Sequence, residues 1–201
     1  PILTNPTQLA AGYDHACALD DTGVVCWGND DYGEATVPEG LSNPIAVASG
    51  RNHSCAIDDT GVVCWGRNQL RQLTVPVMVN NPRQISTKYD HTCVLDDSVR
   101  GVVCWGARGQ GRSAVPDTLS NPTQVSAGLA HSCAVDDNGV ICWGSSRNSR
   151  SDVPEGLVRP TSVSAGSQFS CAIDDNGVTC WGRNHAGQTL VPPLSNPIYV
   201  Y

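Results

Sequence analysis

One pattern of residues occurs five times in this chain of 201 residues. It consists of a cysteine, an acidic turn and the triplet Cys-Trp-Gly, and its first copy runs from Cys17 to Gly28. The first cysteines of successive copies are 38, 38, 40 and 38 residues apart. A fixed period of this length is typical of repeat proteins, in which each unit buries its apolar face against its neighbours.

The repeats are predicted to form a single domain over residues 1–201. Each repeat contains four short strand candidates, which in the first repeat cover residues 7–11, 16–20, 24–28 and 34–37. Gly, Pro, Asn and Asp separate the candidates, and such spacing favours an all-β protein. We therefore predict a β-propeller of about five four-stranded blades. The repeats span approximately residues 5–42, 43–80, 81–120, 121–158 and 159–195, and residues 196–201 begin a sixth.

All ten cysteines lie in these repeats as five pairs. If Asp21 and Thr22 form a hairpin turn, then Leu19 faces Val24 and Cys17 faces Cys26. Directly opposed residues lie almost close enough for a disulfide, whereas zinc ligands are usually spaced more closely in sequence. We predict one disulfide per hairpin and hence an oxidising, extracellular compartment; reduced core thiols are the alternative. The predicted pairs are Cys17–Cys26, Cys55–Cys64, Cys93–Cys104, Cys133–Cys142 and Cys171–Cys180.

The motif Gly-x-x-His-x-Cys-Ala-Leu, followed by Val-x-x-Trp-Gly-x-Asn, resembles the repeats of the regulator of chromosome condensation superfamily. The run from Trp27 to Pro38 is more similar still to a bacterial branch that includes a propeller-type β-lactamase inhibitor. The resemblance covers essentially the whole chain and implies a propeller from a bacterial source. The chain departs from the family in having five repeats where seven are common. It also has paired cysteines where the family usually has aliphatic residues.

The net charge of −7 disfavours nucleic acids and anionic membranes as partners. No stretch of 18 consecutive apolar residues occurs, so no membrane span is expected. Pro1 cannot be an initiator residue, so we expect a processed or trimmed product.

Strand alternation is expected to place acidic turns on one face and most arginines on the other. The acidic face carries the Asp-Asp pair of every hairpin. Asp is a common turn residue because its side chain bonds its own backbone, whereas Arg has no comparable role in turns. The Arg-rich face therefore predicts a binding surface for carboxylates, although both sets of charges also fit solvated turns. The candidate binding residues are Arg67, Arg71, Arg108, Arg112, Arg147, Arg150 and Arg183.

Two further residue types recur at fixed positions. The histidines are expected to be structural, with a ring nitrogen fixing a loop backbone, because Phe169 replaces the fifth and cannot ligate a metal. These residues are His15, His53, His91 and His131. The tryptophans are expected to pack between blades. These residues are Trp27, Trp65, Trp105, Trp143 and Trp181.

No catalytic motif is found, so we predict no enzyme activity, no catalytic residues and no cofactor. The paired carboxylates lie at turns, where access to solvent should leave their pKa values ordinary. Calcium at these turns is an alternative, but no loop has the ligand spacing of an EF-hand, and we predict no metal site.

The last residues form an apolar strand that begins a blade without completing it. Three readings of this strand are open. Its blade was cut short by trimming of the chain, the strand closes the same ring, or it adds to the sheet edge of another chain. The third reading predicts self-association through Asn196, Pro197, Ile198, Tyr199, Val200 and Tyr201.

Our main functional prediction is a non-enzymatic extracellular structural or adhesive module. It self-associates, as head-to-tail polymers or fibres, through the terminal strand and the opposed charged faces. One alternative is a protein- or glycan-binding module that uses the Arg-rich face. A further alternative is a secreted enzyme inhibitor.

Overall fold

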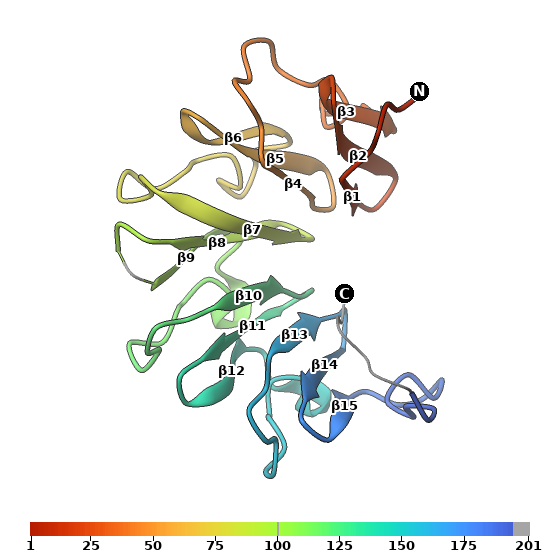
Figure 1. The fold of residues 1–201 in the computed structure, drawn as a ribbon, viewed down its shortest axis with the longest axis vertical. Coiled ribbons are helices and arrows are strands. Elements are labelled where there is room, and N and C mark those ends of the chain that lie inside the picture. Colours follow the sequence, from red (N-terminus) through yellow and green to blue (C-terminus); the bar gives the residue numbers. More distant parts are fainter. Residues whose placement is uncertain (100, 195–201) are drawn as a thin grey trace. The chain divides into compact units, whose positions relative to one another are not determined.

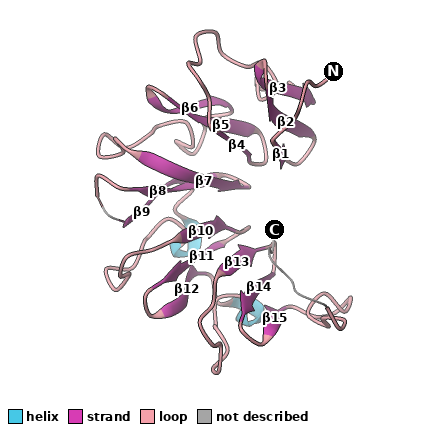
Figure 2. Cartoon of the chain, viewed as in Figure 1, coloured by secondary structure: helices cyan, strands magenta, loops and turns pink. Residues whose placement is uncertain are grey.

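A computed structural model describes residues 1–99 and 101–194 of the chain. These residues form five three-stranded antiparallel sheets and contain no α-helix. Figure 2 shows the strands in magenta and two short 3₁₀ helices in cyan. We call each sheet a blade, numbered in chain order. The prediction of an all-β chain with five repeated blades is confirmed. No helix long and apolar enough to cross a membrane occurs in the described residues.

The first compact unit, residues 1–107, contains blades 1 to 3. Neighbouring blades meet through their first strands, because β4 contacts both β1 and β7 (Figure 1). Blade 1 consists of β1 (Gln8–Ala11), β2 (His15–Asp20) and β3 (Gly23–Gly28). Blade 2 consists of β4 (Ala46–Ser49), β5 (His53–Asp58) and β6 (Gly61–Gly66). Blade 3 consists of β7 (Pro82–Lys88), β8 (His91–Asp96) and β9 (Gly101–Gly106).

The second compact unit, residues 108–201, contains blades 4 and 5. Within it, β13 contacts both β10 and β11 (Figure 1). Blade 4 consists of β10 (Gln124–Ala127), β11 (His131–Asp136) and β12 (Gly139–Gly144). Blade 5 consists of β13 (Ser162–Ala165), β14 (Phe169–Asp174) and β15 (Gly177–Gly182). The 3₁₀ helices η1 (Gly109–Gly111) and η2 (Arg147–Ser149) also belong to this unit.

The hairpin register agrees with the prediction from spacing. In blade 1, Leu19 pairs with Val24 and Cys17 with Cys26. All five predicted disulfides are present, and the Cα atoms of the bonded cysteines lie 4.0–4.1 Å apart. Each disulfide therefore joins two directly opposed residues of one hairpin, including the longer third hairpin.

The predicted fourth strand of each blade is absent from the described residues. In the first repeat, the amides of Ala35 and Thr36 bind Oδ1 of Asp30 at 2.7 and 3.0 Å. Gly33 has a φ of 82° at the start of this segment. The amides that would pair with β3 are thus engaged by a local side chain, and the segment forms a turn. The prediction of four-stranded blades was wrong in this respect, and the described blades have three strands.

The first aspartate of each hairpin pair is buried, contrary to the expectation of solvated turn carboxylates. Oδ1 of Asp58 accepts the amide of Thr60 at 2.8 Å, and its Oδ2 accepts the amide of Ser42 at 2.9 Å. The carboxylate thereby joins its own turn to the connector 16 residues earlier. Burial alone would raise the pKa of Asp58, but these hydrogen bonds outweigh burial and lower it. The pKa values of Asp20 and Asp96 are lowered as well, chiefly by similar hydrogen bonds.

Trp65, Trp105 and Trp181 pack between blades, as predicted. Trp65 of blade 2 contacts Cys17 and Leu19 of blade 1 in one apolar cluster. Its indole Nε1 donates to the carbonyl oxygen of Glu34, in the loop after blade 1, at 3.1 Å. Trp105, Trp143 and Trp181 make the same bond to residues 72, 112 and 150.

His15, His53 and His131 join neighbouring blades through side chains, and not through a loop backbone as expected. Nε2 of His131 lies 2.8 Å from Oγ of Ser170 in the next blade. Ser170 donates its proton to the carbonyl oxygen of Arg150 at 2.9 Å, so Nε2 must be the donor to Ser170. His15 and Ser54 repeat this contact at 2.9 Å. The role is structural, but its partner is a hydroxyl group.

Candidate functional site

Four of the predicted binding arginines surround one hollow in the second unit. The hollow has a volume of about 460 Å³ and lies at the end of blades 4 and 5 opposite their hairpin turns. We call it the Arg hollow. Its lining residues are Gln110, Arg112, Leu129, Ala130, Arg147, Asn148, Arg150, Gln168, Arg183 and His185.

Arg150 is the buried centre of this site, with only 4% of its surface exposed. Its Nε donates to the carbonyl oxygen of Arg147 and its Nη1 to that of Ser167, both at 3.0 Å. Its Nη2 reaches Oγ of Ser145 at 3.2 Å. All three acceptors are neutral. The backbone is fixed too, since the carbonyl oxygen of Arg150 accepts the indole N–H of Trp181 at 3.1 Å.

Arg112 occupies the equivalent position one repeat earlier and is held in the same way. Its Nε donates to the carbonyl oxygen of Gly109 at 3.0 Å, and its Nη1 to that of Leu129 at 2.7 Å. Its own carbonyl oxygen accepts the indole N–H of Trp143 at 3.0 Å. In both repeats the guanidinium therefore binds the carbonyl groups three residues before and 17 residues after it. Such anchoring fixes each cation in one orientation.

Two more arginines and three amide side chains form the rim. Arg147 is exposed, while Arg183 is half-buried and donates from Nη1 to Oε1 of Gln168 at 3.0 Å. The same oxygen accepts Nδ2 of Asn148 at 3.0 Å. Gln110 and Asn148 hold equivalent positions in η1 and η2, with φ values of 63° and 60°. The two loops thus share a backbone conformation one repeat apart, but Gly109 of η1 stands where η2 has Arg147.

The Arg hollow carries positive charge that its own side chains do not balance. No Asp or Glu lines it, and within the described residues Arg147, Arg150 and Arg183 form no ion pair. Burial, with the nearby charges of Arg147 and Arg112, lowers the pKa of Arg150 below its usual value. A guanidinium still keeps its proton at any physiological pH. A buried cation among like charges favours an anionic ligand, which would supply the missing counter-charge.

The first unit has no cation at the same repeat position. There, Glu34 and Gln72 replace the arginines and are fully buried. Oε2 of Glu34 accepts the amide of Tyr32 at 2.8 Å, and its Oε1 accepts Nδ2 of Asn52 at 3.2 Å. Side chains at this position therefore tie the loop down in every case, but only Arg112 and Arg150 present cations.

The other predicted binding arginines lie outside the Arg hollow. In the first unit, the Arg67 guanidinium carbon lies 5.3 Å from the ring centroid of Tyr32, and Arg71 is exposed with a φ of 62°. Arg108 is exposed just before η1. The predicted self-association residues 196–201 lie outside the described residues.

A cluster in the first unit joins side chains that the sequence analysis did not connect. The guanidinium of Arg51 lies 5.5 Å from the ring centroid of Tyr13 and 5.2 Å from that of Tyr89. The two rings meet edge to face at 6.4 Å. All three residues stand two positions before the repeated histidine, and this shared position was the signal that could have linked them.

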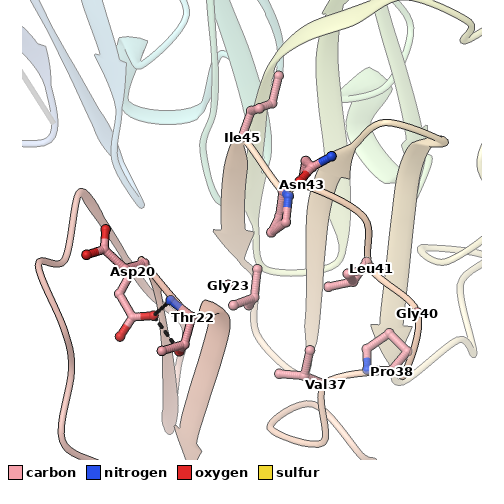
Figure 3. A pocket seen from close by; sticks show the side chains of 12 residues that line it. Asp20, Thr22, Gly23, Val37, Pro38, Gly40, Leu41, Asn43 and Ile45 are labelled. Carbon is pink, nitrogen blue, oxygen red and sulfur yellow. Dashed lines mark hydrogen bonds between the residues drawn. The ribbon is translucent and has the colours of Figure 1, made fainter.

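A second hollow, of about 600 Å³, lies at the hairpin end of blade 1. Figure 3 shows Asp20 of the turn on one side and Val37, Leu41 and Ile45 of the connector on the other. The dashed lines mark the bonds from the amide and hydroxyl groups of Thr22 to Oδ1 of Asp20, at 2.8 and 2.7 Å. The Asp20 carboxylate is thus engaged within its own turn, and the charged residues of this lining are limited to Asp20 and its neighbour Asp21.

Comparison with known protein families gives four matches to one model, the regulator of chromosome condensation (RCC1) repeat. They cover residues 7–34, 45–72, 123–150 and 161–188, which together exceed half of the chain. The third repeat, with its longer hairpin, lies outside the matched ranges. No curated protein sequence matches the chain significantly.

Solved structures with a similar fold include two plant receptor ectodomains and one yeast protein. The ectodomain of receptor kinase CR4 from Physcomitrella patens is 28% identical, with a TM-score of 0.76 over 92% of this chain and 54% of its own. The present chain therefore spans about half of that ectodomain. The CRINKLY WD40 ectodomain of ACR4 from Arabidopsis thaliana is 23% identical, with a TM-score of 0.71 over 89% of this chain and 69% of its own. Prp20p from Saccharomyces cerevisiae is 20% identical, with a TM-score of 0.74 over 94% of this chain and 60% of its own.

Proposed function

The chain belongs to the family of regulator of chromosome condensation (RCC1) repeat proteins, and from that premise we propose that it is a non-enzymatic extracellular binding module. Its Arg hollow takes a partner that carries carboxylate or similar oxyanion groups. The observation that carries the proposal is the guanidinium of Arg150, buried among Arg112, Arg147 and Arg183 without an acidic residue in the lining.

Two findings support the extracellular and non-enzymatic parts of the proposal. Five hairpin disulfides fit an oxidising compartment, and the CR4 match is to an ectodomain. The Arg hollow contains no nucleophile paired with a base, and its groups are suited to binding oxyanions.

Retention on a carboxylate-bearing cation-exchange matrix tests the proposal directly. A protein with a net charge of −7 should pass through such a matrix at pH 7 unless one site binds the matrix strongly. We expect retention at low salt, and its loss on raising the salt or in the variant Arg147→Glu/Arg183→Glu. Arg159→Gln is the matched control, because Arg159 lies at the hairpin end of the same unit and pairs with Asp175. Flow-through of the unchanged protein at low salt would contradict the proposal.

Self-association is a second candidate, and the charge distribution within the second unit supports it. Asp137 and Asp175 are exposed at the hairpin turns, at the opposite end of the sheets from the Arg hollow. Acidic turns of one copy could dock into the Arg hollow of the next, which would link copies head to tail. Sedimentation of the whole chain at low and high salt tests this candidate.

The nearer resemblance to the bacterial branch with the β-lactamase inhibitor stays a prediction, and so does the inhibitor alternative. Assays of the purified chain against a panel of secreted hydrolases test both. Absence of inhibition across the panel would remove the inhibitor alternative.

A further inference from the structure

We propose that the ligand of the Arg hollow is a linear polysaccharide that carries carboxylate or sulfate groups. The chain would run across the successive loops 108–112, 145–150 and 183–185. This inference rests on the proposed function and names the class of partner. Three features of the described residues support it.

The first feature is the repetition of fixed cations. Arg112 and Arg150 are 38 residues apart, at the same position of successive repeats, and the same pair of carbonyl contacts orients each of them. Arg147 and Arg183 also line the hollow, and one repeat earlier their positions are occupied by Gly109 and Ser145. Cations that recur from blade to blade fit a polymer whose anionic groups recur along its length. Because they are already oriented, binding costs little side-chain entropy.

The second feature is the kind of side chain between the arginines. Gln110, Asn148 and Gln168 line the hollow, and each amide can both donate and accept a hydrogen bond. Sugar hydroxyl groups also do both. Guanidinium groups bind carboxylate and sulfate oxygens, and amides bind hydroxyl groups, so the lining offers both kinds of contact that an acidic polysaccharide requires.

The third feature is a lining unlike the centre of a protein interface. Such centres are enriched in aromatic residues and depleted of charge. The Arg hollow has no aromatic lining residue other than the exposed His185, and its apolar lining is limited to Leu129 and Ala130. It also lacks the aromatic platforms on which single-stranded nucleic acids stack. The observations therefore favour a polysaccharide over an acidic protein segment or a nucleic acid.

The test is calorimetric titration of the whole oxidised chain with five probes at matched ionic strength. The probes are dextran sulfate, polygalacturonate, uncharged dextran, poly-glutamate and a single-stranded oligothymidylate of similar charge. We expect both charged polysaccharides to bind on the order of tenfold more tightly than poly-glutamate or the oligonucleotide, and dextran not to bind. Binding should weaken with added salt because the contacts are ionic.

Variants locate the binding without changing Arg112 or Arg150. Arg147→Gln/Arg183→Gln should weaken polysaccharide binding by about tenfold or more, since it removes two charge-assisted contacts. Arg159→Gln removes the same type of charge at the hairpin end and should leave binding unchanged. Thermal unfolding of each variant checks that it is folded, and Arg147→Gln alone serves if the double variant is not.

The outcomes separate this inference from the proposed function. If poly-glutamate binds as tightly as the polysaccharides and depends equally on Arg147, the inference is overturned but the proposed function stands. If the oligonucleotide binds most tightly, the polysaccharide class is wrong. If no charged probe binds, both fail. Unchanged polysaccharide binding in the folded Arg147→Gln/Arg183→Gln variant would also overturn the inference.

Discussion

The buried histidines show how one residue couples blade packing to pH. His53 and His131 are fully buried, and within the described residues the Nδ1 atom of each has no hydrogen-bond partner. Burial lowers the pKa of each from 6.5 to about 4, and for His131 the charge of Arg150 contributes as well. Each imidazole is therefore protonated at a lower pH in the folded chain than in the unfolded chain.

This shift predicts that the free energy of unfolding falls as the pH drops from about 6.5 to about 4, and that the histidine contribution levels off below pH 4. Each histidine contributes up to about 3 kcal/mol to the fall. His131→Phe should fold, since Phe169 occupies the same position in blade 5. The variant loses the bond to Ser170, at a cost of about 1 kcal/mol at pH 7, but its stability should depend less on pH. Urea unfolding at pH 7 and pH 4.5 measures both effects, and an unchanged difference between the two pH values would contradict the argument.

The Asp-Asp pairs contain two residues of the same type with different roles. Asp58 is buried and bonds the amides of Thr60 and Ser42, whereas Asp59 is exposed. We expect Asp58→Ala to lower the free energy of unfolding by about 2–3 kcal/mol, because it leaves buried donors unpaired. Asp59→Ala is the matched control and should cost less than about 1 kcal/mol. Urea denaturation of the two variants measures the difference, and equal losses would show that both residues act only as surface turn residues.

At the scale of the element, one disulfide joins the two strands of each hairpin. Cys55 and Cys64 close a loop of ten residues in blade 2. By the chain-entropy relation, Cys55→Ala/Cys64→Ala should lower the free energy of unfolding by about 2.5–3 kcal/mol. Chemical denaturation of the oxidised proteins measures this value. A loss near zero would show that hairpin pairing alone already restricts the unfolded chain.

Register and disulfide pairing could be predicted from the sequence because both are local. A hairpin with a short turn fixes which residues face each other, so the spacing of Cys17 and Cys26 was sufficient. The fourth strand could not be predicted in this way. In the first repeat, the Asp30 carboxylate binds the amides of residues 35 and 36, which would otherwise have to pair with β3. Which partner these amides take depends on the geometry of the loop.

At the scale of the whole molecule, self-association depends on charge at opposite ends of the sheets. If the acidic turns of one copy dock into the Arg hollow of another, Asp137→Lys should abolish the salt-sensitive oligomers. Asp152→Lys makes the same charge change in the loop after β12 and should not weaken them. Sedimentation velocity at 50 mM and 500 mM salt is the measurement. If the salt-sensitive oligomers persist in Asp137→Lys, other residues make the contact between copies.

The Arg hollow was only partly predictable. Sequence alternation assigned its arginines to one type of loop, because strands of fixed length place every second turn at the same end of a blade. It could not separate Arg150, which is buried, from Arg147, which is exposed three residues earlier. Burial depends on the neighbouring blade, whose Ser167 and Trp181 hold Arg150 in place.

The five repeated motifs by themselves determined the all-β class and the number of blades, which follows from the number of repeats. They also determined the hairpin register and the disulfides, because these follow from contacts within about ten residues. Only the tertiary structure decided which charged residues are structural and which can meet a ligand. The buried aspartates, the histidine–hydroxyl bonds and the cluster of Arg51 with two tyrosines join residues 16 to 39 positions apart. Such contacts depend on how blades pack, and packing sets the desolvation that turns one arginine into an unbalanced buried cation.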